Sequence, residues 1–323
     1  MPKLITRRRL LYAGGVVVGG CALATGGFLI HDHRQRFGRE ADKTIIDHRI
    51  DLPSTVPRMV VAHGSDPRNN VQAVLDRLGG MKRFIGKDDI VVVKPNIGWA
   101  RTPAQGANTH PDVVSAVVRA CREVGPKRLI VSDCPTSDSK KSFQLSGIDK
   151  AAAEAGAEVL PPEDSVYHTV EISERLGTWD VLEPFVIATK LINVPVAKSH
   201  SLTGVTSGLK NWIGITAKLR LMFHNDIQRS IAELAVLMRP TLTVVDASRV
   251  LMDHGPQGGN LADVKQMSMV AAGTDPVALD AWAFSLFGVG IDELPESLHL
   301  VQQAGHGQID YEALQPVEIV TGT

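Results

Sequence analysis

The stretch Ile90-Val91-Val92-Val93-Lys94-Pro95-Asn96 carries the clearest structural signal in this sequence. Its first four residues are branched and apolar, so the segment has no polar face. Such a segment is typical of a strand in a parallel sheet that helices cover on both sides. Lys94 and Asn96 come directly after the apolar run. The stretch therefore predicts a central strand with polar groups at its carboxyl end.

The segments on either side of this strand alternate between helical and extended patterns. Toward the C-terminus, Pro111 begins a predicted helix, Gly125 and Pro126 end it, and residues 128–132 resume strand character. Toward the N-terminus, a predicted strand over 59–63 precedes a helical pattern over 70–78. Further strands are predicted over 157–160, 191–196, 242–246, 269–272 and 317–320, and further helices over 148–155, 227–238 and 276–286. This alternation predicts an α/β fold with a mostly parallel, doubly wound, Rossmann-like sheet.

Two other segments depart from the alternation. Residues 163–190 interrupt it, and 167–172 are predicted to form one strand of a small inserted hairpin. Residues 31–57 are polar and mixed, with Pro53 and Pro57 as breaks, and are interpreted as a linker. The predicted layout is a signal or apolar anchor over 1–30, a linker over 31–57 and a single α/β domain over 58–323.

The N-terminus carries an export signal. Thr6-Arg7-Arg8-Arg9-Leu10-Leu11 resembles the twin-arginine consensus, and residues 10–30 contain no charged side chain. We expect export by the twin-arginine route to a periplasmic or extracytoplasmic location, with membrane contact through residues 10–30. Cleavage of the signal and retention as an anchor both stay open, and lipidation at Cys21 is the less favoured alternative.

Composition excludes some classes of function. The chain of 323 residues has 34 basic and 35 acidic residues, so its charge does not point to nucleic acid as a partner. Outside the N-terminal apolar segment only Cys121 and Cys134 remain, which excludes a disulfide framework. These two cysteines form either one disulfide or, as the simpler alternative, two free thiols.

Polar residues follow several of the predicted strands. They are Lys94 and Asn96, Asp133, the segment Lys198-Ser199-His200, and Asp246. In open parallel sheets, ligands bind beyond the carboxyl ends of the strands. We therefore expect these side chains to converge at one edge of the sheet, although for any one of them a solvated loop position or a helix cap is the alternative.

The segment from Lys198 to Asn211 is rich in glycine, serine and threonine. Its backbone N–H groups, with the hydroxyls of Thr203 and Thr206 and the charge of Lys210, could hold an anion. The glycine spacing before Lys210 is not that of a Walker loop. A purely structural glycine-rich turn is the alternative.

Histidines and a later loop complete the candidate set. His110, His200 and His224 lie in polar, glycine-containing contexts, and a divalent or transition metal held by His200, His224 and Asp246 is one hypothesis. The alternative for each histidine is an ordinary hydrogen-bonded side chain. The segment 254–259 is predicted to be a loop that brings Gly255 and Gln257 close to a ligand. In the next predicted helix, Asp275 is expected to be the N-cap, and Asp280 to face either the site or solvent.

Taken in order, these motifs resemble the DUF362 family of domains of unknown function. The resemblance covers roughly residues 58–290 and rests on Lys94-Pro95-Asn96, Thr109-His110-Pro111, Lys198-Ser199-His200, Leu209-Lys210-Asn211-Trp212-Ile213-Gly214, His224, Val245-Asp246, Gly255-Pro256 and the segment 274–280. Many relatives carry a ferredoxin-like cysteine cluster. This chain departs from that pattern, since Cys121 and Cys134 cannot supply four thiolates, so no iron–sulfur cluster is expected to be bound by this chain alone.

Two hypotheses on function follow. The first is an envelope enzyme that binds an anionic or carbonyl-bearing small molecule, with metal-assisted or redox-linked chemistry left open. Its expected catalytic residues are Lys94, His110, Lys198, His200, Lys210 and Asp246, and its expected cofactor-binding residues are Asn96, Thr203, Thr206, Asn211, Gly255 and Gln257. The second is a non-catalytic protein that binds or matures a cofactor or a redox protein partner.

Overall fold

The fold is centred on one large sheet. A computed structural model describes residues 39–216 and 220–322, and within them ten strands form this sheet. Eight strands follow one another across it in the order β12 (Val317–Val320), β1 (Met59–His63), β11 (Val264–Gly273), β10 (Leu242–Leu251), β7 (Lys190–Val194), β2 (Ile90–Pro95), β3 (Arg128–Val131) and β4 (Glu158–Val159). Beside this path, β8 (Val196–His200) pairs with β10 and with β9 (Gly204–Thr206). The strand predicted from Ile90-Val91-Val92-Val93 thus lies inside the sheet.

Most of the pairings are parallel, as predicted. β10, β7, β2, β3 and β4 form a continuous parallel block, while β11 runs antiparallel to both of its neighbours. No α-helix separates β10 from β11 in the chain, and strands joined without a crossover helix pair antiparallel. This pairing extends both strands, so that β10 reaches Leu251 rather than ending at Asp246. The inserted hairpin is also confirmed, as β5 (Tyr167–Ser173) and β6 (Gly177–Leu182).

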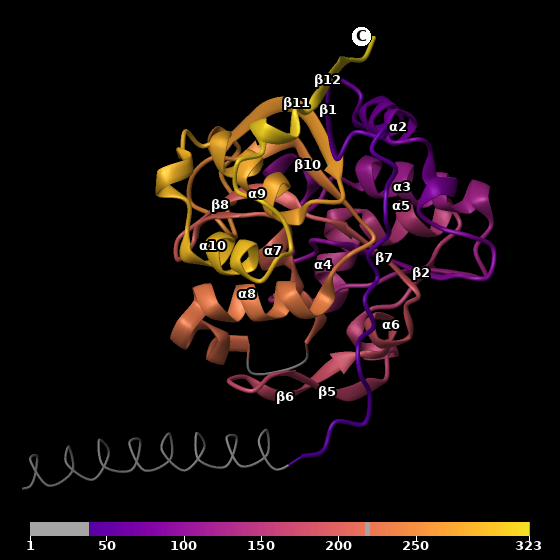
Figure 1. The fold of residues 1–323 in the computed structure, drawn as a ribbon, viewed down its shortest axis with the longest axis vertical. Helices are drawn as coiled ribbons and strands as arrows, with labels where there is room; N and C mark the ends of the chain where they lie inside the picture. The colour runs from indigo at the N-terminus through magenta and orange to yellow at the C-terminus, as the bar shows by residue number, and fades with distance from the viewer. Residues whose placement is uncertain (1–38, 217–219, 323) are drawn as a thin grey trace, which may run out of the picture.

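Helices cover the sheet on both faces. On one side lie α2 (Pro67–Arg77), α3 (Pro111–Val124), α4 (Ser139–Ser146) and α5 (Ile148–Glu154), and on the other lie α7 (Gly208–Asn211), α8 (Ile227–Met238), α9 (Pro276–Ser285) and α10 (Glu296–Gln303) (Figure 1). In β2, Val91 and Val93 pack in the core beneath α2 and α3, whereas Val92 packs in the core with α8 and the hairpin. This alternation is the period of two that a strand imposes on its side chains.

The expected helix starts are confirmed at two caps. His110 precedes Pro111 and its Nδ1 accepts a hydrogen bond from the backbone N–H of Asp112 at 3.0 Å. Asp275 precedes Pro276 and accepts from the backbone N–H of Ala278 at 3.0 Å. Such caps satisfy N–H groups that the first helical turn leaves without a partner.

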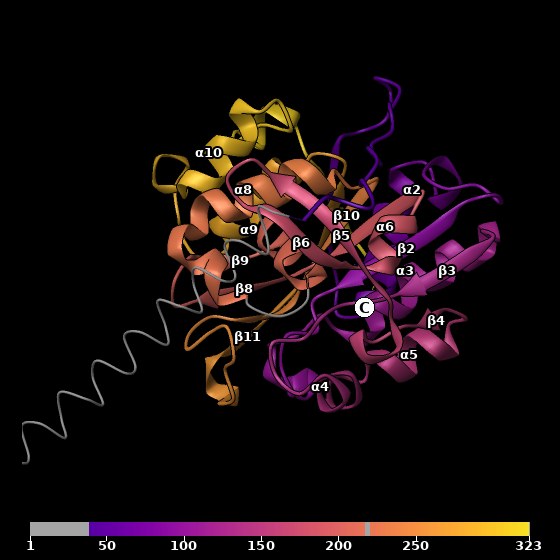
Figure 2. The ribbon, with the colours of Figure 1, turned by 90° about the horizontal axis from the view of Figure 1, so that it is seen from below.

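The segment interpreted as a linker packs against the domain where the structure describes it, from residue 39 onward. Ile45 belongs to the core, and His48 is buried with its carbonyl accepting a hydrogen bond from Thr241 Oγ1 at 2.8 Å. The trace of residues 39–57 runs over the hairpin and up the side of the domain (Figures 1 and 2). The polar, proline-containing sequence of this segment did not indicate these contacts, because they depend on residues that are distant in the sequence.

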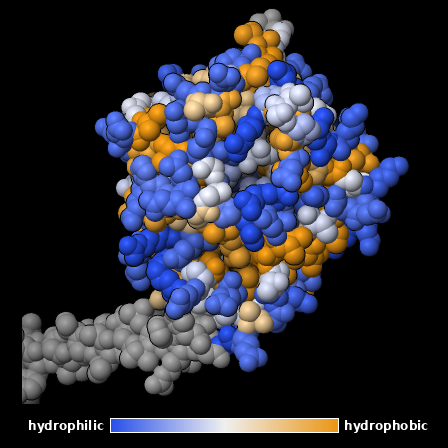
Figure 3. Space-filling model, viewed as in Figure 1, coloured by the Kyte–Doolittle hydropathy of each residue, from blue (hydrophilic) through white to orange (hydrophobic). Residues whose placement is uncertain are grey.

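The visible face of the molecule is mainly hydrophilic, with apolar side chains gathered in smaller areas between (Figure 3). Across 39–216 and 220–322, none of the helices combines the length and apolar character needed to cross a bilayer. The residues expected to direct export, 1–30, lie outside the described residues.

Candidate functional site

A cavity of about 590 Å³ opens beyond the carboxyl ends of the parallel strands. Asn96 follows β2, Asp133 follows β3, and His200 is the last residue of β8. Lys198 also lines the cavity, but it lies in the middle of β8, whereas the sequence predicted that it follows the end of a strand. Other elements complete its wall with Gly98, Trp99, Cys134, Thr206, Lys210, Asn211, Gly214, Arg220, His224 and Pro256. This is the location at which open α/β sheets bind ligands, and several of the predicted site residues meet there.

At the floor of this cavity Lys94 and Asp133 form a buried ion pair. Lys94 Nζ lies 2.7 Å from Asp133 Oδ1 and also donates to Asn211 Oδ1 at 3.1 Å and to the Pro95 carbonyl at 3.1 Å. The Asp133 carboxylate further accepts from the backbone N–H groups of Ile97 and Cys134. Burial lowers the pKa of Lys94, and the Asp133 carboxylate opposes that change. All three N–H bonds of the ammonium therefore have an acceptor.

A chain of amides links this pair to Lys198. Asn211 Oδ1 accepts from both Lys94 Nζ and Asn96 Nδ2, the latter at 3.0 Å. Asn96 Oδ1 in turn accepts from Lys198 Nζ at 2.9 Å, and the Ala107 carbonyl is the second acceptor for that amine. The side-chain amides of Asn96 and Asn211 each accept a hydrogen bond through Oδ1 and donate one through Nδ2. The network therefore fixes the positions of Lys94 and Lys198 relative to each other.

The cavity wall carries an excess of positive charge. Burial, followed by the charge of Lys210, lowers the pKa of Lys198 to about 7. Burial and the charge of Arg220 lower the pKa of Lys210 to about 8. Asp133 is the one carboxylate among the described residues of the wall, and it already pairs with Lys94. Lys198, Lys210 and Arg220 thus have no carboxylate counter-ion among the described residues of the wall.

Arg220 and Thr206 add two further groups to this wall. Arg220 donates to the carbonyls of Cys134 and Pro135, each at 2.6 Å, and these neutral acceptors leave its charge uncompensated. Thr206 is buried, lines the cavity and has no hydrogen-bond partner for Oγ1 among the described residues. An unpaired buried hydroxyl costs free energy, so this atom is a natural contact for a bound ligand.

His200 is a neutral donor in this setting. Burial, with the charges of Lys210 and Lys198, lowers its pKa to about 3. Its Nδ1 accepts a hydrogen bond from the Leu202 backbone N–H at 3.1 Å, so Nε2 carries the proton of the neutral ring. The neutral ring can therefore donate a hydrogen bond from Nε2, and its lowered pKa disfavours the charged imidazolium form near pH 7.

The anion cradle predicted between Lys198 and Asn211 is already filled by the protein itself. At the start of α7, the backbone N–H groups of Gly208 and Leu209 donate to the carboxylate of Asp280, at 2.6 and 3.0 Å. Asp280 is buried, which raises its pKa to about 6 against the effect of these hydrogen bonds. It faces neither the cavity nor solvent. From this segment, Lys210, Asn211 and Thr206 line the cavity.

Three predicted catalytic residues do not line the cavity: Lys94, which is buried and pairs with the lining residue Asp133, and Asp246 and His110. Asp246 is inside β10, where it accepts from the backbone N–H of His110 at 2.7 Å and from Ser248 Oγ at 2.6 Å. His110 caps α3. Neither lines the cavity. The expectation for Asp246 is corrected because β10 continues past this residue, so Asp246 does not stand at a strand end.

Three predicted cofactor-binding residues are also elsewhere. Thr203 Oγ1 donates to the Val205 carbonyl at 3.0 Å within the turn between β8 and β9. Gly255 packs against the backbone of Ser199, where an added Cβ would lie 1.9 Å from the carbonyl oxygen. Gln257 is exposed, and Pro256 is the residue of this loop that lines the cavity. Asn96, Thr206 and Asn211 do line it.

The expected metal ligands are not brought together. His200 and His224 both line the cavity, but Asp246 does not, and the described residues hold no group of three His, Cys, Asp or Glu side chains placed to bind a metal ion. The charges of Lys210 and Lys198 lie near His200, and its Nδ1 already accepts a hydrogen bond from the Leu202 backbone N–H. These residues do not fit a divalent metal site.

Both cysteines outside residues 1–30 are free thiols. Cys121 is buried in α3, and Cys134 lines the cavity with its Sγ 3.0 Å from Arg220 Nη2. Of the two alternatives for this pair, the structure therefore has free thiols. Burial raises the pKa of Cys134, and Arg220 opposes that change.

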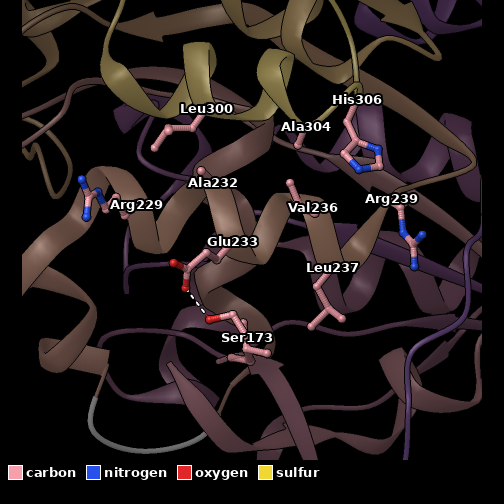
Figure 4. A pocket seen from close by; sticks show the side chains of 11 residues that line it. Ser173, Arg229, Ala232, Glu233, Val236, Leu237, Arg239, Leu300, Ala304 and His306 are labelled. Carbon is pink, nitrogen blue, oxygen red and sulfur yellow. Dashed lines mark hydrogen bonds between the residues drawn. The ribbon is translucent and has the colours of Figure 1, made fainter. Parts of the chain in front are cut away.

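A second cavity, of about 500 Å³, lies between α8 and α10 (Figure 4). Aliphatic side chains such as Ala232, Val236 and Leu300 make up much of its wall. The Glu233 carboxylate is engaged by Ser173 Oγ at 2.5 Å and by Arg175 Nε at 2.7 Å. This cavity lacks the convergence of unpaired polar groups seen at the strand ends, so we assign the candidate site to the first cavity.

Sequence reasoning missed one residue of the site, Arg220, and the partners of two others. Asp133 was expected at this edge of the sheet, but its ion pair with Lys94 was not predicted. Arg220 lies in no periodic segment and gave no signal. Asp280 sits 72 residues from its partner Gly208, and helical spacing alone does not indicate that contact.

Comparisons with known proteins agree with the resemblance seen in the motifs. The family model described as "Domain of unknown function (DUF362)" matches residues 91–285, which include the described wall of the cavity. A thylakoid-associated protein of Synechocystis sp. is 28% identical over 228 residues, which cover 65% of this chain and 67% of that protein.

Two solved structures are similar at low identity. The lactate racemase apoprotein from Thermoanaerobacterium thermosaccharolyticum is 14% identical with a TM-score of 0.46, covering 76% of this chain and 62% of that one. A protein from Thermotoga maritima is 14% identical with a TM-score of 0.41, covering 75% and 60%. The chain thus spans about three fifths of the length of these two solved chains.

Proposed function

The chain belongs to the domain-of-unknown-function 362 family, and from the cavity of this family domain we propose that it is an enzyme acting on a small anionic molecule. The observation that carries the proposal is the unbalanced charge of the cavity wall. Lys94 neutralises Asp133, whereas no carboxylate in the described part of the chain pairs with Lys198, Lys210 or Arg220. A cleft lined by one sign of charge attracts and holds the opposite sign.

The groups available match a small anion in chemistry as well as in charge. Lys210 is a point charge, and Arg220 is a planar donor that suits carboxylate and phosphate oxygens. Thr206 Oγ1 provides an unpaired hydroxyl beside them. His200 supplies one neutral hydrogen-bond donor, suited to a carbonyl oxygen of the bound molecule. A cavity of about 590 Å³ admits a small molecule.

Binding is tested with two probes of the same shape. Isothermal calorimetry on the full chain compares oxalate, a planar dianion, with oxamide, its neutral diamide. We expect oxalate to bind and oxamide to bind at least about tenfold more weakly, since charge complementarity is the main attraction. Equal affinity for the two would contradict the proposal.

Variants locate the binding. Lys210→Gln should weaken oxalate binding by about tenfold or more, because a cavity charge is removed. Lys150→Gln is the matched control, since Lys150 is exposed on α5 and does not line the cavity. If both variants bind oxalate as the wild type does, the anion site lies elsewhere. Binding of natural anions without any turnover would favour the non-catalytic alternative.

We also propose that the chain is exported by the twin-arginine route. The support is Arg7-Arg8-Arg9 followed by the uncharged segment 10–30. A reporter fused after residue 40 should appear outside the cytoplasm, and replacement of Arg7, Arg8 and Arg9 by lysine should retain it inside. A reporter that stays in the cytoplasm in both cases would end this proposal.

A further inference from the structure

The lysines around the cavity differ in how many acceptors surround their amines. Lys94 Nζ has three acceptors, one of them a carboxylate, which is the complement of a charged ammonium group. Lys198 Nζ has two acceptors, Asn96 Oδ1 and the Ala107 carbonyl, and both are neutral. The Lys210 Nζ amine makes no hydrogen bond with the described residues.

Two acceptors are what a neutral amine requires. In the neutral form, the Lys198 amine donates its two N–H bonds to Asn96 Oδ1 and the Ala107 carbonyl. None of the described residues then donates a hydrogen bond to its lone pair. Lys198 is buried, and Lys94 and Lys210 lie near it as like charges, so the amine is held with a pKa of about 7. A large fraction of this side chain is therefore unprotonated at neutral pH.

The cavity leaves room beside this amine. Gly98 lines the wall next to Lys198, and a Cβ added to Gly98 would lie 3.9 Å from Lys198 Nζ. Because this position is a glycine, no side chain covers the amine from that direction. Lys210 and Arg220 line the same cavity and can hold the anionic end of a molecule whose other end reaches the amine.

We propose that Lys198 is a nucleophile that forms an imine with the carbonyl group of an aldehyde or ketone bearing a carboxylate or phosphate. This inference rests on the proposed function, because it requires that the cavity binds a small anion. It narrows the substrate class to carbonyl compounds and assigns the reacting atom to Lys198 Nζ.

The step balances without a further reagent. The Nζ lone pair forms the C–N bond, the π electron pair of the C=O bond moves to oxygen, and one amine proton passes to that oxygen to give a carbinolamine. The second amine proton then leaves with the hydroxyl group as water, and the C=N bond forms. His200 can donate a hydrogen bond from Nε2 to the oxygen as its charge develops, since its Nδ1 is held by Leu202.

The test is reductive trapping with glyoxylate, an aldehyde that carries a carboxylate. The full chain is incubated with glyoxylate and cyanoborohydride near pH 7, digested, and the modified lysines are located by mass spectrometry. We expect carboxymethylation at Lys198 to be at least about tenfold faster than at the exposed Lys150, which serves as an internal reference. Glycolaldehyde, which lacks the carboxylate, should give a smaller preference for Lys198.

Lys198→Arg is the matched variant, because arginine retains a long basic side chain but does not form a stable imine. It should bind glyoxylate in calorimetry and show no trapping at position 198, with Lys150 still modified. If the wild type binds oxalate and glyoxylate but Lys198 is modified no faster than Lys150, the imine inference is overturned and the proposed function stands. If neither anion binds, both fail.

Discussion

Lys94 and Asp133 form an ion pair of 2.7 Å in which both side chains are almost completely buried. Lys94 stands at the end of β2 and Asp133 directly after β3, so two neighbouring parallel strands deliver the two charges to one point. The pair joins the hydrogen-bond network of Asn211, Asn96 and Lys198. Because Lys94 and Asp133 neutralise each other, this pair adds no net charge to the cavity that Lys198 and Lys210 line.

Breaking this pair should destabilise the fold. Asp133→Asn removes the negative charge and leaves the Lys94 ammonium buried without an anion, so we expect a loss of about 3–5 kcal/mol in the free energy of unfolding measured with urea. The control is Glu158→Gln, which breaks the exposed pair with Arg128 and should cost at most about 1 kcal/mol. Adding Lys94→Met to Asp133→Asn should recover part of the loss. Equal effects of the two single variants would contradict this assignment.

Gly214 should not tolerate a side chain. A Cβ at this position would lie 2.3 Å from Asp133 Oδ1 and 3.0 Å from Lys94 Nζ, so Gly214→Ala must displace the ion pair. We expect a loss of about 1–3 kcal/mol in urea unfolding, together with weaker oxalate binding. Gly86→Ala is the control, because its Cβ would make an ordinary contact of 3.6 Å with Asp89. An unchanged oxalate affinity in Gly214→Ala would show that the floor of the cavity does not position the anion site.

Asp280 should give the stability a particular dependence on pH. Its pKa is raised from 3.8 to about 6 in the folded protein, so between these values the folded state binds more protons than the unfolded state. This group's contribution to stability is therefore fully present below about pH 4 and is lost as pH rises through about 6. In Asp280→Asn the contribution is absent, and the stability of the variant relative to the wild type should improve by up to about 3 kcal/mol from pH 4 to pH 7. Urea unfolding at several pH values measures the difference, and a constant difference would contradict the prediction.

Anion affinity should fall as pH rises through the range in which the cavity lysines lose their protons. The pKa of Lys198 is about 7 and the pKa of Lys210 is about 8. Oxalate binding should therefore weaken between pH 6.5 and 9, while oxalate itself keeps its charge. Lys210→Arg should retain more affinity than the wild type at pH 9, because a guanidinium stays charged. Calorimetry at both ends of this range is the measurement, and identical profiles for the two proteins would exclude Lys210 as an anion contact.

His200 should remain neutral across the physiological range. Its pKa of about 3 follows from burial beside Lys210 and Lys198. The imidazole resonances assigned by comparison with His200→Gln should show no titration between pH 5 and 8 in nuclear magnetic resonance spectra. A titration near pH 6.5 would contradict this prediction and would make His200 available for general acid–base catalysis near neutral pH.

Local sequence patterns were enough to predict the strands and helices that position the site. The apolar run Val91-Val92-Val93 and the helical period within 113–124 are local patterns, and each reflects burial on two faces or on one face of a single element. Parallel strands place their carboxyl ends along one edge, so the convergence of Lys94 and Asp133 followed from the same pattern. Asn96, Lys210 and Asn211 were expected beside them, and all three line the cavity.

Which polar groups face the cavity, and which bind other groups of the protein, depends on the packing of distant elements. Asp246 follows an apolar run as Lys94 does, but antiparallel pairing with β11 extends its strand and buries the carboxylate against His110. The N–H groups of Gly208 and Leu209 looked free for an anion, yet Asp280 binds them from a helix far along the chain. Local periodicity reports how each element is buried, whereas the partner of a buried polar group depends on which distant elements pack together, and that information is not contained in any short stretch of sequence.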